Sequence, residues 1–208
     1  MKTHPAYYYP NRMLRIILIA TEEILGRNGL NAVLNTAYLS QYIEQYPPHN
    51  QDMQIPFGYV SALMNAYETI YGPRAGRGVA LRVGRACFKY GLREFGPELR
   101  LTDLSFRLLP MSERLKQGCM AFAELFNQFT DQRVCIEYGD PIIYWHIERC
   151  PLCWERKSDS TVCSLAVGLL QEALYWVSAG KQFLIEERAC IAAGDDRCTI
   201  VIDKHMMS

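Results

Sequence analysis

Cysteine is the residue type whose spacing in this 208-residue chain points most directly to chemistry. Eight cysteines are present, none precedes Cys87, and five of them fall between residues 150 and 198. Those five follow the pattern Cys150-x2-Cys153-x9-Cys163-x26-Cys190-x7-Cys198. In a reducing compartment, such clustering indicates metal binding or redox chemistry before it indicates disulfides.

The spacing is that of a metal site with more candidate ligands than one ion needs. Two thiolates separated by two residues can bind one ion, and a second pair brought close by the fold completes a tetrahedron. The last two cysteines flank a Gly-Asp turn and can converge in this way, and a glutamate three residues before Cys190 adds a carboxylate oxygen. Cys163 is expected in the first turn of a helix, where a thiol pKa is lowered. Six candidates therefore compete for four positions: Cys150, Cys153, Cys163, Glu187, Cys190 and Cys198.

The identity of the metal stays open at this point. Four thiolates suit zinc or an iron–sulfur cluster, whereas a mixture of cysteine and glutamate favours zinc. The alternatives are buried cysteines that pack as small apolar residues, and a thiol redox switch. His146 is a further candidate ligand, although a lone histidine between Trp145 and Ile147 is more often a surface or core residue. Cys119 lies on an apolar helical stripe and is expected to be a packed thiol.

A second candidate site is a stripe of four cations on the helix expected over residues 76–95. At about 100° per residue the four share one face, and they are Arg82, Arg85, Lys89 and Arg93. The opposite face carries the small residues Ala80, Gly84 and Gly91, which allow close approach of another helix and predict burial. The basic stripe then points outward or into a cleft. It is either a solvated helix face or a clamp for the carboxylates or phosphates of a bound small molecule.

No motif of a standard catalytic class is present. The sequence lacks GxSxG, HExxH and a GxGxxG that follows a strand, and the segment GPRAGRG lacks the lysine and Ser/Thr of a nucleotide P-loop. Adjacent carboxylates such as Glu22 and Glu23 point apart and predict no acid–base pair. These observations lean towards a protein that is not an enzyme.

The hydrophobic pattern divides the chain into a helical part, residues 1–132, and a mixed part, residues 133–203. The expected helices of the first part span residues 13–25, 31–46, 57–71, 76–95 and 112–130, with a polar exposed loop over 47–56. In the second part, strands are expected over 133–138, 142–150, 183–189 and 198–203, with a helix over 161–178. No repeat or linker interrupts the chain. We therefore expect one α+β domain over 1–208, a helical N-terminal part packed on an antiparallel sheet, ending in a β-β-α-β-β unit.

Composition limits the partners. The 22 basic and 22 acidic residues cancel, which argues against an electrostatically driven nucleic-acid or membrane partner. The N-terminal segment has no apolar signal region, and no apolar stretch approaches the ~18 residues of a membrane span, so we expect a cytoplasmic chain without a membrane span. The helix over 13–25 is apolar on more than one face, which predicts either burial or contact with a second subunit in a homodimer.

Residues 133–203 resemble the 4-vinyl reductase domain family. The cues are a helix after a cysteine-rich segment, a strand ending in ExxC, a Gly-Asp turn, and then a cysteine with a final strand. Here they are Glu187, Cys190, Gly194-Asp195 and Cys198. The resemblance implies a fold similar to that of the Golgi trafficking-complex subunits, helices packed on an antiparallel sheet and commonly dimeric. It also implies a zinc site like that of the aromatic-responsive sensor domains, where ExxCx7C acts with an upstream cysteine. Cys163 is the nearest such cysteine, while Cys150 and Cys153 are additional to that pattern.

Three functions follow from these observations. The first is a non-catalytic protein that binds or senses a hydrophobic molecule, aromatic or tetrapyrrole, and carries a cysteine-rich structural zinc site. In this case the basic stripe would meet the carboxylates of the ligand. The alternative is an enzyme or accessory protein of (bacterio)chlorophyll vinyl-group reduction that uses an iron–sulfur cluster, since the sequence shows no flavin or nicotinamide site. The third is an interaction subunit similar to the trafficking-complex proteins.

Overall fold

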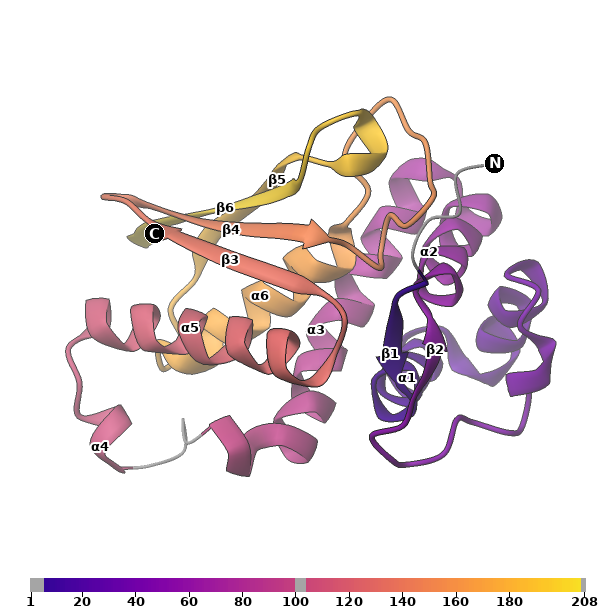
Figure 1. Ribbon diagram of the computed structural model, residues 1–208, viewed down its shortest axis with the longest axis horizontal. Helices are drawn as coiled ribbons and strands as arrows, with labels where there is room; N and C mark the ends of the chain where they lie inside the picture. The colour runs from indigo at the N-terminus through magenta and orange to yellow at the C-terminus, as the bar shows by residue number, and fades with distance from the viewer. Residues whose placement is uncertain (1–5, 100–103, 207–208) are drawn as a thin grey trace.

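The computed structural model describes residues 6–99 and 104–206 (Figure 1). Its main sheet is antiparallel throughout, with the strand order β3-β4-β6-β5. These strands are β3 (Arg133–Tyr138), β4 (Ile142–Arg149), β5 (Phe183–Ala189) and β6 (Cys198–Met206). Helices α5 (Met111–Phe129) and α6 (Ser164–Val177) lie along one face of the sheet (Figure 1). The predicted α+β class and the C-terminal β-β-α-β-β unit are confirmed.

Alternation along the two central strands sets the face of the sheet that packs on the helices. In β4, Ile143, Trp145 and Ile147 are at most 2% exposed, as expected for every second residue of a half-buried strand. The antiparallel register pairs them with buried residues of β6, and Ile147 lies opposite Cys198. Because β4 ends two residues after Ile147, this register brings the start of β6 next to Cys150.

Helix α3 (Pro73–Leu99) crosses α6 where both helices carry glycine. A Cβ atom added to Gly84 would lie 2.0 Å from the carbonyl oxygen of Leu165, and one added to Gly168 would lie 2.0 Å from the carbonyl oxygen of Leu81. The two backbones are therefore in direct contact. Of the small-residue face predicted on this helix, Ala80 and Gly84 are buried, whereas Gly91 is half-buried and has open space beside it.

Helix α1 (Asn11–Thr36) contains a break at Gly26, where φ is 71°. This is the break expected at the glycines that follow residue 25. The apolar residues of the first segment, including Leu14, Ile17 and Leu18, are buried within the chain. The two-sided apolar pattern is thus satisfied by internal packing, and the homodimer stays a prediction. Among the described residues, no helix has both the length and the apolar character needed to cross a bilayer.

The helix predicted over 31–46 ends instead at Thr36. Tyr38 adopts a left-handed conformation with φ of 57°, and the Leu39 N–H donates to the Leu34 carbonyl at 2.8 Å. This is a Schellman C-cap, a position that glycine usually occupies. Because tyrosine stands there, the sequence carried no stop signal. A single 3-10 turn, Ser40–Tyr42, follows.

Two further boundaries differ from the prediction. The expected loop over 47–56 contains β2 (Met53–Pro56), which pairs with β1 (Tyr8–Pro10) in a separate two-stranded sheet whose partners Tyr9 and Ile55 are buried. Helix α3 continues past Gly96 and Pro97 instead of ending at Phe95. Phe95 packs on Phe129 and under the Arg12 guanidinium, which holds this turn in place.

The remaining elements agree closely with the sequence or are short. Helix α2 (Phe57–Tyr71) has the predicted bounds, and α5 shifts by one residue at each end. Helix α6 begins later than predicted, so that Cys163 is its N-cap residue. The short segments are α4 (Leu104–Arg107) and a 3-10 turn, Ile191–Ala193.

Candidate metal centre and cavity

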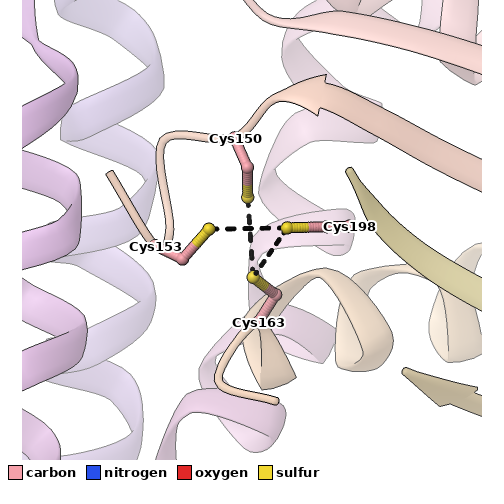
Figure 2. Close-up of side chains that lie close together, drawn as sticks. All are labelled: Cys150, Cys153, Cys163 and Cys198. Carbon is pink, nitrogen blue, oxygen red and sulfur yellow. Dashed lines mark hydrogen bonds between the residues drawn. The ribbon is translucent and has the colours of Figure 1, made fainter. Parts of the chain in front are cut away.

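Four cysteine thiols from separate parts of the chain meet where β4 ends and β6 begins (Figure 2). Cys150 and Cys153 lie in the loop after β4, Cys163 precedes α6, and Cys198 is the first residue of β6. Each is at most 1% exposed, and the four Sγ atoms all lie within 4.8 Å of one another. The Sγ–Sγ distance is 3.5 Å for Cys150–Cys163, 3.4 Å for Cys153–Cys198 and 3.8 Å for Cys163–Cys198.

Two more candidate ligands reach the same cluster, Glu187 from β5 and Cys190 from the position that follows this strand. The Sγ atom of Cys190 lies 3.8 Å from that of Cys163 and 3.9 Å from that of Cys198. Glu187 accepts a hydrogen bond on Oε2 from the Cys163 N–H at 2.7 Å, while its buried Oε1 has no hydrogen-bond partner among the described residues. The ligand atoms of Cys163, Glu187, Cys190 and Cys198 also lie within 4.8 Å of one another. The fold thus brings all six predicted candidates together.

Local hydrogen bonds hold the turns that carry these side chains. The carboxylate of Asp195 accepts from the Cys190 N–H at 2.7 Å, and the Ile191 N–H donates to the Cys198 sulfur at 3.4 Å. On the other side, Arg156 in the loop after β4 forms an ion pair with Glu68 of α2 at 2.8 Å. The loop is therefore tied to the helical part of the chain as well as to the sheet.

When no metal is bound, the thiols of the cluster hydrogen-bond to one another, and these bonds shift their pKa values. Burial raises the pKa of Cys150, and hydrogen bonds with the other thiols, first with Cys150, raise the pKa of Cys163 and of Cys198. The lowered pKa predicted for Cys163 is therefore wrong, because this residue is the N-cap of α6 and its hydrogen bonds to the other thiols prevail. The same bonds lower the pKa of Cys153, since its thiolate accepts them. Burial also raises the pKa of Glu187. A divalent ion that binds here must displace protons from the neighbouring thiols.

The other predicted metal candidates lie elsewhere. His146 is buried in β4, its Nδ1 lies 3.0 Å from the Thr199 hydroxyl, and burial lowers its pKa, so it is the core residue that the sequence favoured. Cys119 is a packed thiol whose pKa burial raises to about 12, as expected. Cys87 is also buried outside the cluster, and Cys135 contacts Glu148 on β4 at 3.6 Å.

The basic stripe points outward. All four of its cations are exposed, and none is among the described residues that line the apolar cavity discussed below: Arg82, Arg85, Lys89 and Arg93. The Arg85 guanidinium donates to Gln171 on α6 at 2.7 Å, and that of Arg93 lies 5.7 Å from the centre of the Tyr90 ring. A role for this stripe in ligand binding stays a prediction.

The sequence did not reveal an apolar cavity of about 100 Å³ between the helices and the sheet. Its wall is built by β1, α1, α3, α5, β4 and α6, so no single periodic segment could have indicated it. Six aromatic side chains line it: Tyr9, Phe88, Phe95, Phe122, Phe126 and Trp145. The Tyr9 hydroxyl donates to Gln132 Oε1 and forms the main polar part of the wall.

The cavity and the cysteine cluster share a wall. Cys150, Pro151 and Leu152 of the loop after β4 line the cavity, and so do Leu165 and Ala166 in the first turn of α6. The loop after β4 carries two candidate metal ligands, and α6 begins at a third. Both therefore form part of the cavity wall.

Comparison with known proteins shows the fold. No protein-family model and no curated protein sequence matches the chain. A variant of the Tt H-NOX protein superimposes with a TM-score of 0.60 and 14% identity over 96% of this chain and 97% of that chain. A structure described as probing heme distortion in the H-NOX family superimposes with a TM-score of 0.59 and 13% identity, over 96% of this chain and 97% of that chain. The phenol-responsive sensory domain of the transcription activator PoxR, with phenol, has a TM-score of only 0.46 and 17% identity, over 69% of this chain and 73% of that chain. This chain therefore has the H-NOX fold, while membership of the 4-vinyl reductase family stays a prediction.

The described wall of the cavity lacks the histidine that most often holds a heme iron. Heme iron needs an axial ligand, most often a histidine or a thiolate. None of the described histidines, His49, His146 and His205, lines the cavity. Of the two cysteines in its wall, Cys87 has a pKa raised by burial and Cys150 belongs to the cysteine cluster. At about 100 Å³, the space inside the cavity in this conformation is also smaller than a four-pyrrole macrocycle.

Proposed function

We propose that this chain is a non-catalytic sensor domain that binds a small apolar molecule in the cavity and holds zinc in the cysteine cluster. The observation that carries the proposal is the wall that the two sites share at Cys150, Pro151 and Leu152. Because the metal holds this loop in place, a ligand that presses on the loop changes the surroundings of the metal, and the metal in turn shapes the cavity.

The size of the cavity limits the ligand class. An engineered apolar cavity of roughly 150 Å³ in another protein binds benzene. A cavity of about 100 Å³ lined by six aromatic rings therefore suits a one-ring aromatic or a short aliphatic molecule. The hydrogen-bonded Tyr9–Gln132 pair in the wall is where a small polar group of that ligand would find a partner. We therefore favour such a ligand over a tetrapyrrole, the other ligand class expected from the sequence.

The sulfur positions support zinc over an iron–sulfur cluster. Four thiolates around one zinc ion, each about 2.3 Å from it, stand roughly 3.8 Å apart in a tetrahedron. The Sγ–Sγ distances given above run from 3.4 to 3.9 Å. In an iron–sulfur cluster the four thiolates are divided between two or four iron atoms, so as a set they spread more widely than around one ion. The five sulfurs are all buried, and the ligand atoms lie within 4.8 Å of one another inside each of the two groups of four described above. This leaves no open position for a substrate and favours a structural role.

The first expected result concerns the metal. Protein purified without oxygen should be colourless and contain zinc, because the sulfurs are spaced for single ions. Elemental analysis together with the visible absorption spectrum makes the measurement. A brown protein with iron and acid-labile sulfide would refute the zinc assignment and support the reductase alternative.

The second expected result concerns the cavity. Gly91 lines it, and a Cβ atom there would meet nothing within 4 Å, so Gly91→Phe places a ring in the ligand space. Gly78 lies on the same helix, is exposed and is equally open, so Gly78→Phe is a matched control. One-ring aromatics should raise the melting temperature of the wild type and of Gly78→Phe, but not of Gly91→Phe. A ligand present at 100 times its Kd stabilises by about 2.7 kcal/mol.

The measurement is a thermal-shift series with benzene, toluene, phenol and indole, repeated by NMR for any compound that shifts the melting temperature. If no compound stabilises the wild type, or if Gly91→Phe responds as strongly as Gly78→Phe, the cavity is not the binding site.

A further inference from the structure

The six ligand atoms of the cluster form two quartets that share an edge. The first consists of Cys150, Cys153, Cys163 and Cys198, and the second of Cys163, Glu187, Cys190 and Cys198. The shared edge is the Cys163–Cys198 pair, with 3.8 Å between the sulfurs. Each quartet has the number of ligands that one tetrahedral ion requires.

We propose that the centre holds two metal ions, bridged by the thiolates of Cys163 and Cys198. This rests on the metal site of the proposed function and adds a second ion to it. One ion would take Cys150 and Cys153 as its terminal ligands, and the other would take Cys190 and Glu187. A thiolate sulfur keeps free lone pairs after it binds one ion, so it can bind a second.

The distances around Cys190 match this arrangement. Its sulfur lies 3.8 and 3.9 Å from the sulfurs of Cys163 and Cys198, close to the roughly 3.8 Å edge of a zinc–sulfur tetrahedron. Cys190 is fully buried and is not part of the first quartet. A single ion bound by the first quartet would therefore leave Cys190 against two metal-bound sulfurs with no ion of its own.

Charge favours the second ion as well. One Zn²⁺ with four thiolates and the Glu187 carboxylate leaves three uncompensated negative charges in a buried site. Two Zn²⁺ ions with five thiolates and the carboxylate leave only two uncompensated negative charges. Burying an uncompensated charge is costly. The second ion would also give Glu187 Oε1 a partner, which this buried oxygen lacks among the described residues.

Metal stoichiometry tests the proposal. The full chain, purified with zinc and desalted, should contain two zinc ions per chain by elemental analysis. Cys190→Ala and Glu187→Gln should each lower the ratio to one, and Cys135→Ser, a half-buried cysteine outside the cluster, should keep it at two. A ratio of one zinc ion per wild-type chain would refute the proposal of a second ion and leave the proposed function intact. No bound metal would refute both.

Cadmium NMR tests the bridge and does not depend on whether a variant folds. The cadmium-substituted wild-type chain should give two signals, because one ion has four sulfur ligands and the other has three sulfurs and an oxygen. The two signals should split each other through the shared thiolates. A single signal, or two signals without mutual coupling, would overturn the bridged arrangement.

Discussion

Cys198→Ser is expected to release the metal and to unfold the β-β-α-β-β part of the chain. Cys198 begins β6, which pairs with β4 on one side and β5 on the other, and its sulfur belongs to both quartets. Structural zinc contributes on the order of 10 kcal/mol of apparent binding free energy in small peptides. A folded domain is stable by only about 5–15 kcal/mol. The variant should therefore melt far below the wild type or fail to fold, and Cys190→Ser should show the same loss to a smaller degree, since its thiol belongs to one quartet.

The measurement combines metal analysis with thermal melting followed by circular dichroism. Wild-type protein stripped by a chelator should melt like Cys198→Ser, which separates loss of the metal from any other effect of the serine. Cys135→Ser should keep its metal and its melting temperature, and Cys119→Ser should keep its metal, because that buried thiol lies outside the cluster. Full metal content and wild-type melting in Cys198→Ser, with loss of metal in Cys119→Ser, would show that the ligand assignment is wrong.

Gly84→Ala is expected to destabilise the fold strongly, although it adds only one methyl group. Its Cβ atom would lie 2.0 Å from the Leu165 carbonyl oxygen and 2.9 Å from the Leu169 nitrogen, and neither backbone atom can turn away. Helices α3 and α6 would have to separate. Overpacking a core usually lowers the free energy of unfolding by about 1–3 kcal/mol. A substituent that clashes with backbone atoms should cost as much as the upper end of this range, or more. Because α6 begins beside Cys163, the shift should also weaken metal binding.

Gly78→Ala supplies the control on the same helix. That position is exposed and open, so alanine should stabilise the helix by up to about 1 kcal/mol through its higher helix propensity. Gly168→Ala, on the other side of the crossing, should reproduce the effect of Gly84→Ala. Denaturant unfolding of the four proteins makes the comparison. Equal stability of Gly84→Ala and Gly78→Ala would mean that the helices do not cross as closely as described.

The sequence was informative where a structure depends on local periodicity. The alternation in residues 133–138 predicted β3 with its observed bounds, and the stripe that includes Leu115, Cys119 and Phe122 predicted the buried face of α5. The cysteine spacing likewise selected all six residues that meet in the cluster. In each case the residues themselves, and not their neighbours in space, carry the information.

The predictions that were wrong concern positions where contacts from elsewhere in the chain prevail over local preference. Tyr38 takes a conformation that usually belongs to glycine, because buried Leu39 closes the cap behind it. Pro97 does not end α3, because Phe95 is held by Phe129 and Arg12. A strand as short as β2 is stable only because β1 pairs with it.

Only the tertiary structure decided how the candidate residues group and what they face. Spacing alone could not divide six ligands into two quartets, because that division depends on the register of β4 against β6 and on where α6 begins. The basic stripe could have lined a cleft, yet the buried glycine face of α3 turns it to solvent. The cavity is the clearest case. Periodicity tells which face of each element is apolar, but a cavity exists only where the apolar faces of several elements meet without filling the space between them.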